Sequence, residues 1–305
     1  MKKQHFVPKG YLTNFAQKDK KIFVYDKFEN RSFPTNINDI AQENCFYDLP
    51  SEIMDDKNHD TKIIEKILAE FDSIHAANLA CILKRIKDKK RLFQEQKEKL
   101  ADFVALQYLR TKDFRETSIE CFEEMTEKIV TLIHKENTGN DIANQFQIKM
   151  KNIDHVPHHA KIMFDKNLIE TLKNVLLSHY YLIGQNNTGT DFYVSDSPII
   201  LNSHNKDPMS RNVRGFLSPG IEILLPIANN YAISYFDKNY FPNLSFYNGN
   251  IIELKSTHIE YYNSLQVLEA QRYIYCRSNN FEFAKKVLQG SPDAVNPNRK
   301  KFSIS

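Results

Sequence analysis

Near its start the chain reads Gln4-His5-Phe6-Val7-Pro8-Lys9-Gly10-Tyr11-Leu12-Thr13-Asn14-Phe15, an apolar run that contains one histidine and is interrupted by a proline. The residue before a proline favours an extended backbone, so Phe6 and Val7 are predicted to lie in a strand. After the glycine, one short turn of helix is predicted by the spacing of the apolar residues Tyr11, Leu12 and Phe15. The chain is therefore expected to turn from strand to helix just after His5.

His5 is the first candidate functional residue. Burying a titratable side chain in apolar surroundings costs free energy unless another group pairs with it. An imidazole at such a corner is suited to act as a general acid or base. Lys9, four residues later, is a candidate contact to substrate.

Length and composition limit the class of protein. The 305 residues are 41% hydrophobic and can bury a large core, so we expect a single domain over residues 1–294 and a basic tail over 295–305. The net charge of +3 creates no overall field that demands nucleic acid. Four scattered cysteines favour neither a disulfide scaffold nor zinc, and indicate a reducing cytoplasm. No run of roughly eighteen apolar residues occurs, so no membrane partner is expected.

Hydrophobic periodicity places strands towards the two ends and helices in the middle. Strands are predicted at 21–26, 191–194, 199–201, 221–226 and 231–236. Helices are predicted from about 61 to 91, from about 94 into the 130s with a break near 111–114, before Met150, over 160–183 and over 256–275. This order predicts an α+β fold, in which the N-terminal and C-terminal segments form a small, mainly antiparallel sheet around a helical insertion at about 60–183.

The second long helix carries polar residues where its apolar stripe should continue, namely Gln107, Arg110 and Thr111. An arginine keeps its charge in a protein, so burying it requires carboxylate, phosphate or carbonyl partners. Two interpretations stay open. Arg110 either forms a structural ion pair with a neighbouring element or stabilises the charge of a bound phosphate.

Another polar segment, Ser195-Asp196-Ser197-Pro198, lies between two short apolar strands. A carboxylate between hydroxyls can bind a cation, accept a hydrogen bond from an arginine or act as a general base. The same residues are equally typical of a turn, because Asp and Ser side chains bond to local backbone amides.

Two further clusters favour structural interpretations. The basic segment 84–91 could contact phosphate, but no aromatic residues alternate with its charges, so a solvated helix end is favoured. Residues 154–159 contain three histidines and an aspartate. Pro157 interrupts the helix that a two-histidine zinc motif needs, so no metal ligands are assigned there, and only His159 is kept in view.

The order of these motifs resembles a bacterial family known as domain of unknown function 4238. The resemblance spans residues 4 to about 276 and implies one domain of about this length. It implies no activity. The stretches that carry it are His5 to Phe15, Phe23 to Asp26, Asn44 to Tyr47, Gln107 to Thr111, Ser195 to Pro198, and Asn263.

These residues suggest two classes of function. The first is a nuclease-like hydrolase of a phosphodiester or nucleotide, suited to bacterial defence or to a toxin and compatible with a divalent metal. Its catalytic residues would be His5, Gln107, Arg110 and Asp196. Its substrate contacts would be Lys9, Thr111, Ser195 and Ser197. The alternative is a non-catalytic sensor or partner-binding module, in which the same residues form a structural network. In either case, we expect His5, Arg110 and Asp196 to share one pocket that faces solvent.

Overall fold

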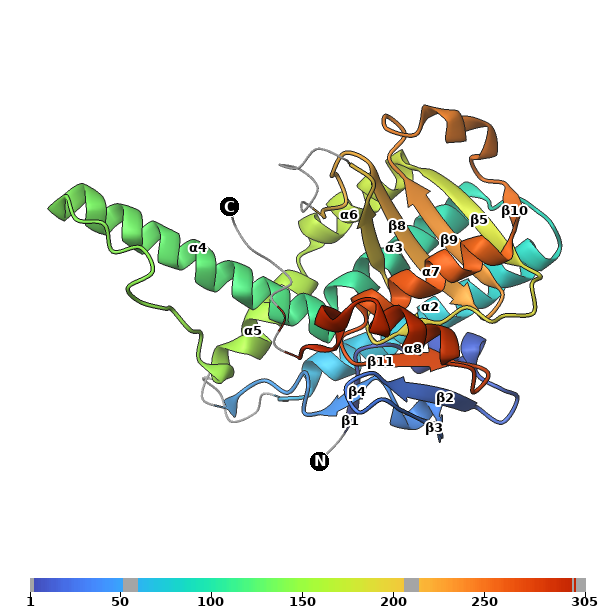
Figure 1. Cartoon of the computed structure of the whole chain (residues 1–305), viewed down its shortest axis with the longest axis horizontal. Helices are drawn as coiled ribbons and strands as arrows, with labels where there is room; N and C mark the ends of the chain where they lie inside the picture. The colour runs from blue at the N-terminus through green and yellow to red at the C-terminus, as the bar shows by residue number, and fades with distance from the viewer. Residues whose placement is uncertain (1–2, 52–59, 206–213, 298, 300–305) are drawn as a thin grey trace.

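The computed structural model describes residues 3–51, 60–205, 214–297 and 299. Within these ranges the chain forms a two-stranded, a four-stranded and a five-stranded sheet, and Figure 1 shows helices packed around them. The strands, in chain order, are β1 Lys3–His5, β2 Lys21–Asp26, β3 Arg31–Asn36, β4 Gln42–Asn44, β5 Tyr180–Asn186, β6 Val194–Ser195, β7 Ile200–Ser203, β8 Ile221–Ala228, β9 Tyr231–Phe236, β10 Ile251–Leu254 and β11 Tyr273–Cys276.

The helices fill the middle of the chain and recur near its end. They are α1 Lys9–Leu12, α2 Ile63–Lys87, α3 Gln94–Leu109, α4 Lys112–Thr138, α5 Asn152–Met163, α6 Lys166–Ser178, α7 Ser256–Glu269 and α8 Glu282–Gln289. Shorter 3-10 turns are η1 Thr13–Phe15, η2 Ile37–Asp39, η4 Pro242–Tyr247 and η5 Pro292–Val295. This arrangement confirms the predicted α+β class.

The two ends of the chain meet in the four-stranded sheet, whose order is β3-β2-β11-β6. All of its pairs are antiparallel, and Tyr273 of β11 lies opposite Asp26 of β2. N-terminal and C-terminal segments therefore share a sheet, as the sequence predicted.

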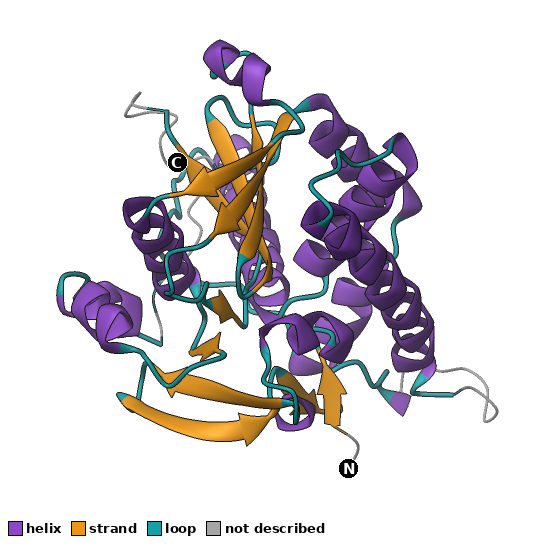
Figure 2. Ribbon diagram, turned by 90° about the vertical axis from the view of Figure 1, so that its right-hand side faces the viewer, coloured by secondary structure: helices purple, strands orange, loops and turns teal. Residues whose placement is uncertain are grey.

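The five-stranded sheet, in the order β10-β5-β9-β8-β7, lies between helices. Its pairs are antiparallel except for the parallel pair β10 and β5. Every residue of β8 is buried, which is expected for a strand covered on both faces. Figure 2 shows the helices on either side of this sheet.

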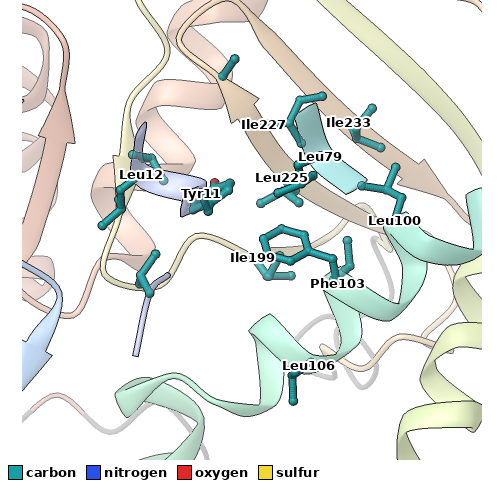
Figure 3. Packing of buried hydrophobic residues seen from close by; sticks show 14 of the residues in the cluster. Tyr11, Leu12, Leu79, Leu100, Phe103, Leu106, Ile199, Leu225, Ile227 and Ile233 are labelled. Carbon is teal, nitrogen blue, oxygen red and sulfur yellow. The ribbon is translucent and has the colours of Figure 1, made fainter. Parts of the chain in front are cut away.

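Different helices cover the two faces. On one face, residues of α2 and α3 join the core cluster that includes Leu225 and Ile233 of the sheet, and Figure 3 shows Leu79, Leu100 and Phe103 beside these strands. Tyr11 lies in the same cluster and donates a hydrogen bond of 2.5 Å to the carbonyl of Pro226. On the other face, Ile259 of α7 belongs to a cluster with Phe192, Ile200, Leu224 and Ala232.

Several predicted boundaries are wrong. No helix occupies residues 140–150, and the predicted helix over 160–183 divides into the end of α5, then α6 and β5. The predicted helix over 256–275 ends at Glu269, where Ala270 is extended, and β11 follows. Aromatic and branched residues in β5 and β11 fit strands as well as helices, and sheet pairing decides between them. Phe6 and Val7 lie just after β1 and not within it.

Other predictions fall partly outside the described residues. The helix break near 111–114 is confirmed, because α3 ends at Leu109 and α4 begins at Lys112. Residues 52–59 and 206–213 and most of the predicted tail at 295–305 lie outside the described ranges. The division into one domain and a tail stays a prediction.

The first helix approaches α2 so closely that only glycine fits at the contact. A Cβ atom built on Gly10 would lie 2.6 Å from the Cβ of Ala76. Real Cβ atoms do not come this close, so any side chain at Gly10 must push the two helices apart. The glycine therefore fixes how the corner after His5 rests on α2.

We predict that Gly10→Ala lowers the free energy of unfolding by about 1–3 kcal/mol, the range for overpacking a core contact. Ala76→Gly by itself should cost about 1 kcal/mol, because it places a glycine inside a helix. Since it also removes the clashing methyl group, the double variant should lose less stability than the sum of the two single losses. Urea unfolding of the two single variants and the double variant measures this coupling. Gly290→Ala is the matched control, because the nearest atom to its added Cβ lies at 3.5 Å. Equal effects of Gly10→Ala and Gly290→Ala would contradict the prediction.

Candidate functional site

Arg110 is the centre of the polar cluster, and its side chain is only 2% exposed. It follows the last residue of α3, and its guanidinium forms an ion pair with Asp72 of α2. One of its terminal nitrogens also donates a 2.7 Å hydrogen bond to the carbonyl oxygen of His5. Burial by itself lowers the pKa of this arginine, but Tyr47 and Asp72 outweigh burial and raise it. Arg110 therefore joins α2, α3 and β1 as a permanent cation.

Gln107 performs a similar task one turn earlier on α3. Its side chain is fully buried, and its amide nitrogen donates to the carbonyl of Phe6 at 3.1 Å. Its amide oxygen has no hydrogen-bond partner among the described residues. Because Gln107 and Arg110 bind successive backbone carbonyls, they hold the end of β1 against α3.

His5 is half-buried at the end of β1, opposite Gln42 of β4. Burial, reinforced by the charges of Lys9 and Arg110, lowers its pKa to about 4, although Asp72 and the backbone of Ile37 act in the other direction. The ring is therefore neutral at neutral pH. Its Nε2 atom is buried and has no hydrogen-bond partner among the described residues. The structure thus brings His5, Lys9, Gln107 and Arg110 together.

Thr111 is close in sequence to this cluster but has a different task. Its hydroxyl accepts from the backbone N–H of Phe114 and donates to the carbonyl of Tyr108. It is the N-cap of α4, and such a cap typically stabilises a helix by about 1 kcal/mol. These local hydrogen bonds occupy the hydroxyl of Thr111 that was predicted to contact the substrate.

Asp196 lies in the turn that joins β6 to β7 and is bound by backbone groups. Its carboxylate accepts three hydrogen bonds of 2.8 Å from the N–H groups of Gln271, Arg272 and Tyr273. Burial raises the pKa of Asp196, and these three bonds act against that effect. Within the described ranges, no hydrogen bond or ion pair connects Asp196 to His5 or Arg110. The carboxylate thus fastens the start of β11.

The two serines beside Asp196 complete this turn. The hydroxyl of Ser195 lies 2.8 Å from the amide oxygen of Gln266 on α7 and 2.9 Å from the carbonyl of Ser197. The same hydroxyl accepts from the N–H of Ser197. The hydroxyl of Ser197 is buried, with no partner among the described residues. The turn interpretation of this segment therefore describes the contacts that the structure shows.

His159, outside the predicted catalytic set, is fully buried beside the cluster. Its Nδ1 accepts a 2.9 Å hydrogen bond from Arg115, and its Nε2 lies 2.7 Å from the carbonyl of Leu109. Burial and the charge of Arg115 lower its pKa to about 3. The ring is therefore a neutral link between α5, α3 and α4.

The sequence assigned no role to Asp72, and it placed Tyr47 only within a stretch that carries the family resemblance. Asp72 carries the carboxylate that neutralises Arg110, and the hydroxyl of Tyr47 donates to the carbonyl of Arg110 at 3.0 Å. Asp72 lies on a helix rich in charged residues, and nothing in its spacing separates it from them. The sequence indicated only that a buried arginine needs a carboxylate partner, and it did not indicate which residue carries that carboxylate.

Two hollows in the described part of the molecule lie elsewhere, because none of their lining residues belongs to the cluster. A cavity of about 80 Å³ is lined by Gln94, Lys97, His179, Tyr181 and Tyr235, among others. A wider groove of about 580 Å³ is lined by Lys89, Arg91, Tyr247, Asn250 and residues 251–253. Within the described ranges, no group of three or more His, Cys, Asp and Glu side chains could hold a metal. Over the same ranges, no helix combines the length and the apolar character needed to cross a membrane.

We predict that Asp72→Ala lowers the free energy of unfolding by about 3–5 kcal/mol, because it leaves the charge of Arg110 buried and unpaired. Arg110→Met should cost less, because the side chain of Asp72 is 25% exposed and can be hydrated. In the double variant Asp72→Ala/Arg110→Met the loss should be much smaller than the sum of the two. Urea unfolding measures all three.

The matched control for this cycle is Glu95→Ala, which breaks the exposed pair between Glu95 and Lys99. Exposed pairs contribute about 0–1 kcal/mol, so this variant should unfold almost like the wild type. An Asp72→Ala variant no less stable than Glu95→Ala would contradict the structural role of Arg110.

The chain matches a known protein family. The model of a family described as "Protein of unknown function (DUF4238)" matches residues 3–280. No curated protein and no solved structure matches the chain. The matched range covers every stretch that carries the resemblance seen in the sequence, from His5 to Asn263. The chain belongs to the DUF4238 family.

Proposed function

We propose that this chain is a non-catalytic partner-binding protein, in which the cluster around Arg110 is structural. The observation that carries this proposal is the ion pair of Arg110 with Asp72, formed by a guanidinium that is only 2% exposed and also binds the carbonyl of His5. A group that stabilises substrate charge must reach the substrate. This guanidinium is instead held by the protein itself.

The proposed docking element is α4, which projects away from the rest of the molecule in Figure 1. Beyond the buried Ile119, five of its large apolar side chains are between 47% and 60% exposed, and they follow a helical spacing of three and four residues: Phe122, Met125, Ile129, Leu132 and Ile133. The segment after α4 runs back along another side, where Glu123 and Glu127 accept hydrogen bonds from the backbone of Met150 and Ile148. A continuous exposed apolar stripe of this kind is typical of a helix that lies in a partner's apolar groove.

A cytoplasmic location is part of the proposal. All four cysteines are free, including the buried Cys276. Free thiols persist most readily in a reducing compartment.

A photo-crosslinking residue placed at Met125 should join α4 to a protein partner in the cells that make the chain. The adduct should disappear in the Ile129→Glu/Leu132→Glu background, because two charges then lie in the apolar stripe. Leu217→Glu is the matched control, since this leucine is 72% exposed elsewhere on the surface, and it should leave the adduct unchanged. Mass spectrometry of the adduct measures the outcome. A wild-type chain that gives no adduct, or an adduct that survives both charges, contradicts the role of α4.

A hydrolase is the second candidate, and one observation favours it. His5 has a neutral ring, and its Nε2 atom has no partner among the described residues, so it could receive a proton from a bound water. Turnover of bis(p-nitrophenyl) phosphate or of labelled RNA, with and without Mg²⁺ or Mn²⁺, tests this candidate. Activity that vanishes in a folded His5→Ala variant would favour the hydrolase; we expect no activity above buffer and no effect of His5→Ala.

A further inference from the structure

A groove lies between the turn that follows α2 and the edge strand β10. Its volume is about 580 Å³, and it is lined by Lys89, Arg91, Tyr247, Asn250 and residues 251–253. In Figure 1 the connection from α2 to α3 passes beside β10. We call this surface the β10 groove. None of its lining residues belongs to the cluster around Arg110 or to α4, so a ligand in this groove would bind independently of the proposed function.

The α2 side of the groove is strongly basic. Residues 84–91 contain six cations and one acid. Within the described ranges none of these six side chains forms an ion pair with a carboxylate. Lys89 and Arg91 donate instead to the neutral amide oxygens of Gln185 and Asn250. These bonds hold the two cations in the groove without neutralising them. One carboxylate, Glu253, also lines the groove and accepts a hydrogen bond from the side chain of Asn187, so the two cations outnumber it and favour an anionic ligand.

An exposed aromatic ring lines the groove together with these cations. Tyr247 lines the groove and is 50% exposed, and its neighbour Phe246 is 85% exposed. Asn250 connects the two sets, because its side chain accepts from Arg91 and donates to the carbonyl of Phe246. The basic segment contains no aromatic residue of its own, and the fold supplies these rings from η4, more than 150 positions later in the chain.

We propose that the β10 groove binds single-stranded nucleic acid. Lys89 and Arg91 would contact successive phosphates, and bases would stack on Tyr247 and Phe246. A cationic groove combined with exposed rings is the arrangement that holds single strands without sequence preference. A ligand that carries only negative charge would not contact the rings. An apolar protein surface would cover the rings but would leave the two cations without an anionic partner.

Fluorescence anisotropy of the full chain with a labelled oligothymidylate of about 20 nucleotides tests the proposal. Binding should weaken as salt rises, since phosphate contacts release counterions. Lys89→Ala/Arg91→Ala should weaken binding at least about tenfold and reduce the slope of log affinity against log salt by about 1.4, because two contacts are lost at about 0.7 each. Phe246→Ala should weaken binding by about 5- to 100-fold and leave that slope unchanged.

The Phe246→Ala variant can still test the proposal if other variants misfold, because the side chain of Phe246 is 85% exposed and its removal should not disturb the fold. Lys18→Ala and Phe71→Ala are the matched controls, a lysine and a phenylalanine exposed elsewhere on the molecule, and both should bind like the wild type. Far-ultraviolet circular dichroism checks the fold of each variant.

Three results would overturn the proposal. The first is no binding by the wild-type chain at low salt. The second is an equal loss of affinity in Lys18→Ala and in Lys89→Ala/Arg91→Ala, which would indicate a diffuse charge effect. The third is a Phe246→Ala variant that binds the oligonucleotide like the wild type while heparin competes as well as nucleic acid, which would assign the groove to polyanions in general.

Discussion

A single buried guanidinium constrains the architecture around the N-terminus. Arg110 ends α3, forms an ion pair with Asp72 of α2 and donates to the carbonyl of His5 at the end of β1. An arginine cannot lose its charge to escape burial, so the three elements must stay where its partners are. The hydroxyl of Tyr47 adds a fourth attachment through the carbonyl of Arg110. The strand, the corner after it and two long helices are thereby placed relative to one another by one side chain.

The sequence revealed half of this arrangement. Helical spacing placed Gln107 and Arg110 at core positions, and both are buried. It could not reveal their partners, because the carbonyls of His5 and Phe6 exist at every residue and Asp72 resembles the other charged residues of α2. Likewise, Asp196 was an evident turn or site residue, but the three backbone N–H groups that it binds lie some 75 residues later. The residue types of a short stretch predict which side chains carry charge or form hydrogen bonds. They do not predict which distant residues those side chains bind in the folded chain.

The same limit applies to the elements themselves. The long periodic helices α2 and α3 were predictable, and so was the hairpin of β8 and β9, whose apolar runs are bounded by turn residues. The strands β5 and β11 were predicted as parts of the neighbouring helices. A short apolar segment fits the helical period and the strand period equally well, and only its pairing with another strand distinguishes the two. Residues 84–91 contain no aromatic side chain, and the fold brings Tyr247 of η4 to the groove beside Lys89 and Arg91 from a remote part of the chain.

The pairing of β2 with β11 has a consequence for synthesis of the chain. Tyr273 pairs with Asp26, so about 250 residues separate the two strands. At about 5–20 residues per second, a ribosome releases β11 roughly 12 to 50 seconds after β2 has emerged. Throughout that interval the inner edge of the β2–β3 hairpin offers unpaired N–H and C=O groups to any neighbouring strand. The nascent chain therefore carries an open β edge for most of its translation, and such an edge can pair with a strand of another chain.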